Sequence, residues 1–353
     1  SGSCFCGAIQ FEVDSAQKTH SICCHCSDDR LWSAMPFLPC HALRASGFRY
    51  IKGEDQVREC QKGKKLNDCA SQIRCSCSIC GTRLLLWHHD RSIAKVMAGC
   101  VSTWSFKPDM HCFCREAVVD VEALVTECSN RLYLDFPSEF GGSGQAVTRT
   151  NGYSKFHLGV YDGNLIEKPT QQPIELPPYP GPIPPAVHTG SCFCGAVEFE
   201  VDSAEKILTC CCHCTDDRQW SGMPFLAVHT VNASGFKYCK GEEQVIEFQK
   251  KLDTGKGQIR SFCGICGTGF VYWQHDRSMA KVMVGSVPTW SIKLDIHYFC
   301  KEAVVDILAL TRDCPDKLFL DLPEAFGGSG EVVERINACS NIASHGVVES
   351  ADF

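Results

Sequence analysis

The sequence predicts a mainly β protein that contains two copies of one domain. Short cysteine patterns recur in the same order in both halves of the chain, and the segments beside them alternate apolar and polar residues as half-buried strands do. The separation is 188 positions from Cys4 to Cys192 and from Cys24 to Cys212, and 186 positions from Cys77 to Cys263. Because stacked repeats have periods of about 20 to 50 residues, this spacing indicates duplication of a whole domain.

The predicted boundaries place the first copy at 1–149 and the second at 188–353. Between them, 150–187 is expected to form an arm and a proline-rich linker, since eight prolines fall within 167–185. Proline fixes φ and removes an amide donor, so this stretch is unsuited to a helix interior or a central strand. The two domains are expected to pair within one chain.

Strands are expected where apolar and polar residues alternate, at 8–13 in the first copy and 196–201 in the second. The segments 270–273 and 281–284 are rich in β-forming residues and lie between turn residues. Short helices are expected at 28–34 and at 323–326, where Pro323 suits a first helical position.

The cysteine spacing predicts two structural zinc sites. A Cys-x-Cys and a Cys-x-x-Cys that meet in space supply the four thiolates of a tetrahedral site. The chain has 27 cysteines, an odd number, and no signal-like opening segment, which favours thiols over disulfides and a cytoplasmic, reducing location. The predicted structural ligands are Cys4, Cys6, Cys77 and Cys80 in the first copy and Cys192, Cys194, Cys263 and Cys266 in the second.

Charge and hydropathy exclude two classes of partner. The formal net charge is -7 and no dense block of Lys and Arg occurs, so binding to a nucleic-acid backbone is not expected. Apolar runs such as 84–87 are far shorter than the roughly 20 residues of a membrane-spanning helix, so no membrane span is expected.

A third repeated motif lies between the two cysteine pairs. Cys-Cys-His-Cys-Ser-Asp-Asp-Arg at 23–30 matches Cys-Cys-His-Cys-Thr-Asp-Asp-Arg at 211–218. With the other two patterns, this series resembles the glutathione-dependent formaldehyde-activating family, also called the CENP-V/GFA domain. The resemblance covers almost all of both copies and implies a β-rich, Mss4-like fold that is clamped by zinc.

The resemblance also implies a reactive zinc site in each copy, formed by Cys-His-Cys-x-x-Cys-Arg. This chain departs from that pattern because the third cysteine is replaced by Asp29 in the first copy and by Asp217 in the second. The arginine that follows is retained as Arg30 and Arg218.

Three interpretations of the altered site stay open. In the first, Cys24, Cys26 and Asp29, with Cys212, Cys214 and Asp217, bind up to two further zinc ions, since carboxylates also ligate zinc. In the second, no metal binds, and the aspartate acts as an acid or base near His25 and Arg30, or near His213 and Arg218. In the third, Cys23 or Cys75 replaces the missing thiolate.

Two further histidines and four tryptophans each have two possible locations in the fold. His111 and His297 either face the pocket or end a strand. Four tryptophans are expected in the core or in a pocket wall, namely Trp32, Trp104, Trp220 and Trp290.

The functional expectation is a zinc-containing enzyme that resembles carbon–sulfur lyases of this family. With Asp29 and Asp217 as its polar centres, it acts at an electrophilic carbon of a small organic substrate or thiol adduct, in a pocket walled by both domains. Secondary metabolism would suit such a duplicated enzyme. The alternative is a non-catalytic module in which zinc only clamps the sheets.

Overall fold

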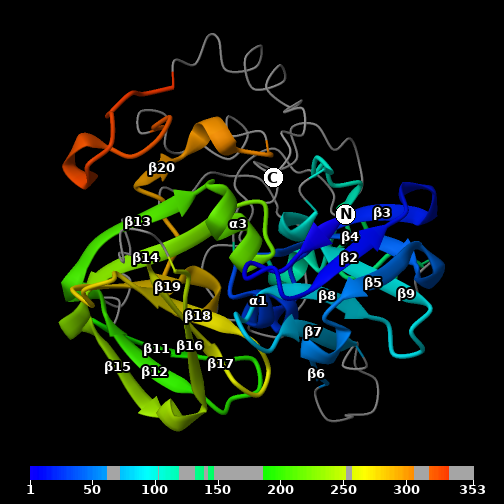
Figure 1. Ribbon diagram of the computed structural model, residues 1–353, viewed down its shortest axis with the longest axis horizontal. Helices are drawn as coiled ribbons and strands as arrows, with labels where there is room; N and C mark the ends of the chain where they lie inside the picture. Colours follow the sequence, from blue (N-terminus) through cyan, green and yellow to red (C-terminus); the bar gives the residue numbers. More distant parts are fainter. Residues whose placement is uncertain are drawn as a thin grey trace, which may run out of the picture.

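The computed structural model describes residues 1–61, 72–101, 103–118, 132–138, 142–146, 186–251, 257–305 and 318–333. Within these ranges the chain forms two similar groups of sheets that lie side by side, the first copy in blue and cyan and the second in green and yellow (Figure 1). The prediction of two mainly β domains is confirmed. Most of the predicted linker, 150–185, lies outside the described residues.

Each copy combines a three-stranded sheet with a seven-stranded sheet. In the first copy the strand orders are β1-β2-β5 and β10-β3-β4-β9-β8-β7-β6. The strands are β1 (Gly2–Ser3), β2 (Gln10–Val13), β3 (Lys18–Cys24), β4 (Leu38–Arg44), β5 (Phe48–Lys52), β6 (Val57–Cys60), β7 (Ile73–Cys77), β8 (Arg83–Trp87), β9 (Ile93–Met97) and β10 (Met110–Cys112).

The second copy repeats this topology strand for strand. Its orders are β11-β12-β15 and β20-β13-β14-β19-β18-β17-β16. The strands are β11 (Val187–Ser191), β12 (Glu198–Asp202), β13 (Lys206–Cys212), β14 (Leu226–Asn232), β15 (Phe236–Lys240), β16 (Val245–Gln249), β17 (Ile259–Cys263), β18 (Gly269–Trp273), β19 (Met279–Met283) and β20 (Ile296–Tyr298). All four segments expected as strands therefore contain one.

The last strand of each large sheet is parallel to its neighbour, whereas the other pairs of named strands are antiparallel. In the first copy β10 lies beside β3 with His111 opposite Cys23, and in the second β20 lies beside β13 with His297 opposite Cys211. This register brings the end of each domain next to its Cys-His-Cys motif.

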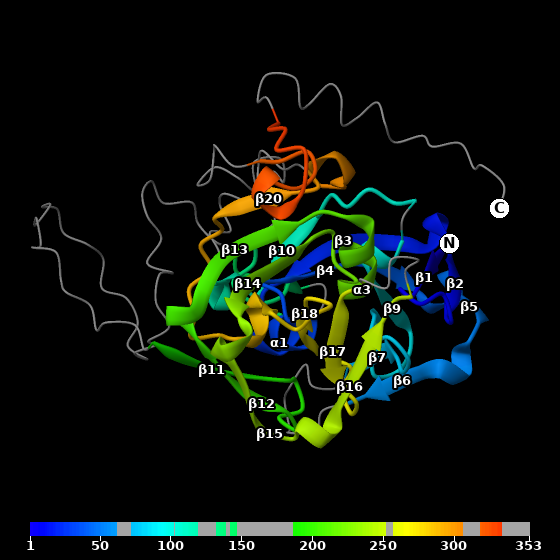
Figure 2. The same cartoon turned by 60° about the vertical axis from the view of Figure 1, so that its left-hand side comes forward.

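Two short helices, α1 (Ser27–Ser33) and α3 (Thr215–Ser221), lie between the two groups of sheets (Figures 1 and 2). Each begins at a cysteine: the Sγ atoms of Cys26 and Cys214 accept hydrogen bonds from the backbone N–H groups of Asp29 and Asp217. Two acidic residues in the first turn of each helix complement the positive end of its dipole. The predicted helix at 28–34 is confirmed within one residue.

Short 3-10 turns recur at matching places in the two copies. They are η1 (Ser15–Gln17) and η8 (Ser203–Glu205), η2 (Ala45–Gly47) and η9 (Ala233–Gly235), η3 (Glu54–Gln56) and η10 (Glu242–Gln244), η5 (Ala98–Cys100) and η11 (Val284–Ser286), and η6 (Cys114–Glu116) and η12 (Cys300–Glu302). A further turn, η13 (Glu324–Phe326), follows Pro323, as the sequence predicts.

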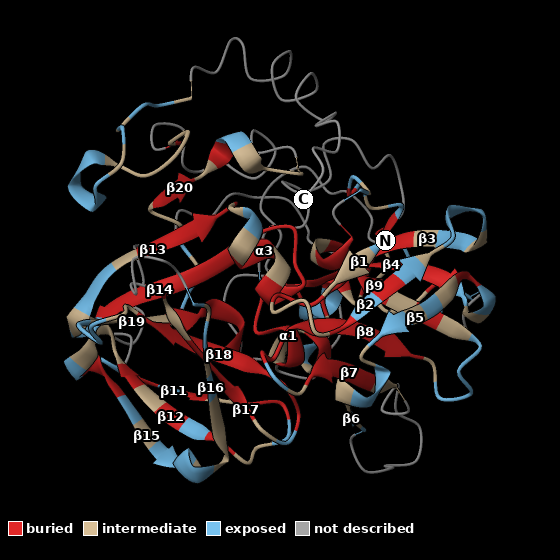
Figure 3. Cartoon of the chain, in the orientation of Figure 1, coloured by how far each residue is buried: buried red, intermediate tan, exposed pale blue. Residues whose placement is uncertain are grey.

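Most buried hydrophobic residues of both copies belong to one continuous core, and the buried segments are coloured red in both groups of sheets (Figure 3). The helices join the copies reciprocally: the indole Nε1 of Trp32 donates to the carbonyl oxygen of Cys266 (3.1 Å), and that of Trp220 donates to the carbonyl oxygen of Cys80 (2.9 Å). Both tryptophans are fully buried, as the sequence predicts for core residues. Among the described residues, no helix is both long and apolar enough to cross a membrane.

Candidate metal centres

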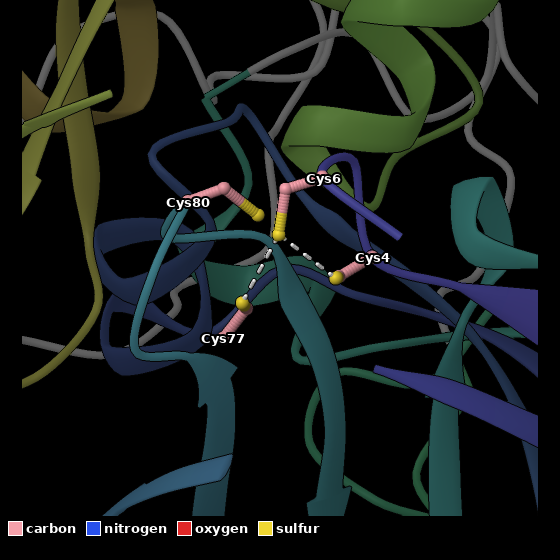
Figure 4. Close-up of side chains that lie close together, drawn as sticks. All are labelled: Cys4, Cys6, Cys77 and Cys80. Carbon is pink, nitrogen blue, oxygen red and sulfur yellow. Dashed lines mark hydrogen bonds between the residues drawn. The ribbon is translucent and has the colours of Figure 1, made fainter. Parts of the chain in front are cut away.

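Four cysteine side chains of the first copy converge at one point (Figure 4). Cys4 and Cys6 lie in the loop that joins β1 to β2, Cys77 ends β7, and Cys80 lies in the turn before β8. The sulfur of Cys6 is 3.4 Å from that of Cys4 and 3.8 Å from that of Cys77. Zinc–sulfur bonds of about 2.3 Å in a tetrahedron place sulfur atoms about 3.8 Å apart, so the arrangement fits a zinc ion.

The second copy repeats this cluster with Cys192, Cys194, Cys263 and Cys266. The sulfur of Cys194 is 3.5 Å from that of Cys192 and 3.8 Å from that of Cys263. All eight cysteines are free thiols. The structure thus brings together both sets that the spacing predicts as structural ligands.

Hydrogen bonds and burial favour a thiolate at some sulfur atoms of each cluster and a protonated thiol at others, such as Cys80 and Cys263. The backbone N–H of Ile9 donates to the sulfur of Cys4 (3.2 Å), and that of Val197 donates to the sulfur of Cys192 (3.3 Å). Hydrogen bonds from Cys6, Cys77 and Cys80 lower the pKa of the Cys4 thiol. Hydrogen bonds from the other three cysteines of its cluster lower the pKa of the Cys266 thiol in the same way. A deprotonated sulfur is the form that ligates metal.

The third motif forms a smaller cluster at the start of α1. Cys24 ends β3, Cys26 caps the helix, and Asp29 lies in its first turn. The ligand atoms of these three residues all lie within 4.8 Å of one another, and the two sulfur atoms are 3.4 Å apart. In the second copy the sulfur atoms of Cys212 and Cys214 are 3.3 Å apart, and Asp217 occupies the matching position. Two thiolates and a carboxylate suit a three-ligand zinc site.

Each aspartate of these clusters is held by a buried arginine. Arg74 Nη2 lies 2.8 Å from Asp29 Oδ1, and Arg260 Nη2 lies 2.9 Å from Asp217 Oδ1. The arginines extend from β7 and β17, and all four side chains are at most 8% exposed. One carboxylate oxygen is therefore committed to the arginine, and Oδ2 remains the free ligand atom.

The glutathione-dependent formaldehyde-activating enzyme family model matches residues 1–116 and 187–302 of the chain. These two matches span most of both copies. The chain belongs to this family. A crystal structure of a Rhodobacter sphaeroides protein is also similar, with 20% identity over 37% of this chain and 98% of that protein, at a TM-score of 0.25.

The arginine of the family motif does not face the aspartate that precedes it. The Nε atom of Arg30 donates to the carbonyl oxygen of His25 (3.0 Å), and Arg218 donates to that of His213 at the same distance. Both arginines therefore stabilise the backbone of the Cys-His-Cys motif. Their predicted catalytic role stays a prediction.

His25 and His213 are fully buried, and each pairs with a second histidine. His25 Nε2 lies 3.0 Å from His111 Nδ1, and His213 Nε2 lies 3.1 Å from His297 Nδ1. Burial lowers the pKa of His111 and of His297 to about 4 and that of the other two well below its usual range, so all four are neutral near pH 7. Catalysis by His25 and His213 stays a prediction.

A cavity of about 600 Å³ opens onto the cluster of the second copy. Its wall includes Cys212, Cys214, Asp217 and Arg260, the cationic side chains of Lys250 and Lys281, and the aromatic side chains of Tyr298, Phe299 and Phe326. Among the described residues, every one that lines the cavity belongs to the second copy, whereas the sequence led us to expect a wall formed by both domains. A second hollow of about 510 Å³, over β5 and β6, includes no cysteine.

The remaining alternative for the third ligand finds no support in the geometry. Cys75 lies on β7 with its sulfur 3.9 Å from Glu59, and burial raises the pKa of its thiol above the ordinary range. Cys23 lies opposite His111 in the parallel pair, so it projects from the sheet on the side opposite to Cys24. The three-residue cluster contains Asp29 instead of either cysteine.

Sequence reasoning missed Arg74 and Arg260. A signal was present, because both follow an isoleucine at matching positions of the two copies and are the only charged residues of largely buried strands. A repeated charge inside a buried strand requires a buried partner of opposite charge.

Proposed function

We propose that this chain is a zinc-containing, lyase-type enzyme that makes or breaks a carbon–sulfur bond at an electrophilic carbon of a small organic substrate. The observation that carries the proposal is the cavity whose wall contains Cys212, Cys214 and Asp217 beside Arg260. Family membership supports the reaction class. A role in secondary metabolism and a thiol adduct as substrate fit this chemistry and belong to the same proposal.

Cys212, Cys214 and Asp217 would hold the reactive ion, and Cys24, Cys26 and Asp29 would hold its counterpart in the first copy. Zinc bound there supplies Lewis acidity toward a carbonyl-type oxygen. Replacing one thiolate by a carboxylate leaves the ion more electron-poor than three thiolates would. A more electron-poor ion can activate a carbonyl carbon that is less reactive than the carbon of the simplest aldehyde.

Arg260 keeps the carboxylate of Asp217 in place and neutralises its charge inside the protein. The aromatic side chains of Tyr298, Phe299 and Phe326 provide apolar walls that exclude water from the reacting carbon. Lys281 projects into the same cavity and is available to a negatively charged group of the substrate.

The experiment compares the wild-type chain with the double variant Asp29→Ala/Asp217→Ala. Loss of free thiol is measured with glutathione and a series of aldehydes of increasing size, beside zinc analysis of the same samples. We expect two fewer zinc ions per chain in the variant than in the wild type, and a loss of thiol consumption of at least about 100-fold. Unchanged turnover in the variant would rule out the proposed reactive site.

A matched control is Cys239→Ser, which changes an exposed cysteine of the second copy. This variant should retain both the zinc content and the turnover of the wild type.

A second candidate function is a non-catalytic, zinc-clamped binding module. The buried Arg74–Asp29 and Arg260–Asp217 pairs favour it, because an aspartate in such a pair already has a structural role. This candidate predicts the same zinc content in the wild type and the double variant, and no thiol consumption with any aldehyde of the series.

A further inference from the structure

Strand β13 carries two different sets of side chains on its two faces. Cys210, Cys212 and Cys214 line the cavity described above. Because successive side chains of a strand point to opposite faces, Cys211 projects to the other side of the sheet, where His213, just after the end of β13, contacts it. These two residues take no part in the proposed reactive site.

The parallel neighbour β20 adds a third ligand-type side chain on that side. His297 lies directly opposite Cys211 in the register of the two strands. The sulfur of Cys211 is 3.6 Å from Nε2 of His213, and this Nε2 is 3.1 Å from Nδ1 of His297. All three ligand atoms lie within 4.8 Å of one another.

These separations are those of a metal site. Bonds of about 2.3 Å to sulfur and about 2.0 Å to nitrogen in a tetrahedral arrangement place sulfur and nitrogen about 3.5 Å apart, and two nitrogen atoms about 3.3 Å apart. We propose that Cys211, His213 and His297 form an additional metal site, distinct from the thiolate clusters, for a zinc or cuprous ion. Both ions accept one thiolate and two imidazoles as ligands.

The surroundings of this Cys-His-His site suit a structural ion. Cys211, His213 and His297 are each 0% exposed, so no bulk water reaches the three ligand atoms. The site joins β13 to β20 across the edge of the large sheet, where the two strands share only a short parallel ladder. An ion there would fasten the end of the domain to the strand that carries the reactive cysteines.

The first copy repeats the histidine pair and the strand register. His25 Nε2 lies 3.0 Å from His111 Nδ1, and Cys23 lies opposite His111 in β3 and β10. The two copies differ at many positions of the cavity wall; for example, Tyr298 of the second copy matches Cys112 of the first. Both copies nevertheless contain this cysteine and both histidines.

X-ray absorption spectroscopy at the metal edge tests the site, because imidazole rings produce a characteristic outer-shell scattering. Neither the four-cysteine clusters nor the Cys-Cys-Asp clusters contain a histidine. Full-length protein is prepared in two forms, one loaded with zinc and one with cuprous ion. We expect imidazole scattering in at least one of the two forms. In the variant His213→Gln/His297→Gln, the imidazole contribution should decrease by the amount that two rings produce.

The matched control is His275→Gln, which removes a partly exposed histidine of the second copy outside the Cys-His-His site and should leave the spectrum unchanged. Cys211→Ser provides a second variant, with one sulfur lost from the ligand shell, should the histidine double variant fail to fold. Absence of imidazole scattering from the wild-type protein in both metal forms would overturn the proposal. The same holds if the scattering persists undiminished in the double variant, since it would then come from other histidines.

Discussion

Asp29 and Asp217 are buried carboxylates, and each determines which side chain must lie beside it. Each carboxylate brings a charge into the protein interior, and a buried charge requires a partner. Arg74 supplies that partner to α1 from strand β7, and Arg260 supplies it to α3 from strand β17. Each guanidinium also lies over an aromatic ring of the opposite copy, Arg74 at 4.1 Å from Phe193 and Arg260 at 4.2 Å from Phe5.

Replacing Arg260 by methionine should lower the free energy of unfolding by about 3 to 5 kcal/mol, because the variant leaves Asp217 as an unpaired buried charge. Denaturant unfolding followed by circular dichroism measures this change. Arg277→Met is the matched control: its ion pair with Glu247 is 49% and 36% exposed, so its loss should cost less than about 1 kcal/mol. Equal effects of the two substitutions would contradict the structural role given to Arg260.

At the scale of secondary structure, the four-cysteine clusters connect strands of different sheets. The Cys-x-Cys loops follow β1 and β11, whereas the Cys-x-x-Cys turns join β7 to β8 and β17 to β18. Each cluster therefore fastens the small sheet to the large one. Since metal binding and folding are coupled in such sites, ion affinity contributes directly to the stability of the domain.

Cys263→Ser should remove one zinc ion per chain and lower the melting temperature by roughly 10 °C or more, since a lost structural ligand removes several kcal/mol of ion binding. Elemental analysis and differential scanning calorimetry measure the two effects. Cys239→Ser, at an exposed position of the same copy, should alter neither quantity. Unchanged zinc content in Cys263→Ser would show that this cluster does not bind the ion.

At the scale of the molecule, the two copies pack against each other as the subunits of a dimer do. The contact that Arg83 makes between them is asymmetric. Arg83 of the first copy is fully buried and its Nε donates to the carbonyl oxygen of Ser221 (2.9 Å) in the second. The matching residue of the second copy is Gly269, where an added Cβ would lie 2.6 Å from Arg83 Nη1. The space at this contact accommodates one arginine, so the second copy has none.

Backbone contacts between the copies lead to a prediction at Gly99. Its N–H donates to the carbonyl oxygen of Gly222 (2.9 Å), and an added Cβ would lie 2.2 Å from the backbone oxygen of Met223 in the other copy. Gly99→Ala should therefore separate the copies locally and lower the free energy of unfolding by about 2 to 3 kcal/mol. Thermal and denaturant unfolding of the full-length chain measure this loss.

Gly327→Ala serves as the control for Gly99→Ala. Gly327 has a φ of +81° but no atom within 4 Å of an added Cβ, so only the backbone penalty of about 1 to 2 kcal/mol is expected. If Gly99→Ala is no more destabilising than this control, the tight approach of the two copies is not a major source of stability.

The sequence by itself determined the duplication, the mainly β class and the eight ligands of the four-cysteine clusters. These features are local or periodic: two cysteines in one short turn stay close whatever the rest of the chain does, and alternation reports a half-buried strand. It also predicted that Cys24, Cys26 and Asp29 lie close together, because they are near neighbours in the chain.

Only the tertiary structure decided which distant groups complete these sites. Arg74 meets Asp29 through the packing of β7 against α1, His297 meets Cys211 through the register of a parallel strand pair, and Trp32 meets the cysteine turn of the opposite copy. Each of these contacts depends on strand order, register and the docking of two domains. Spacing along one chain does not encode those quantities, because contacts between residues far apart in sequence arise only when the whole core has formed.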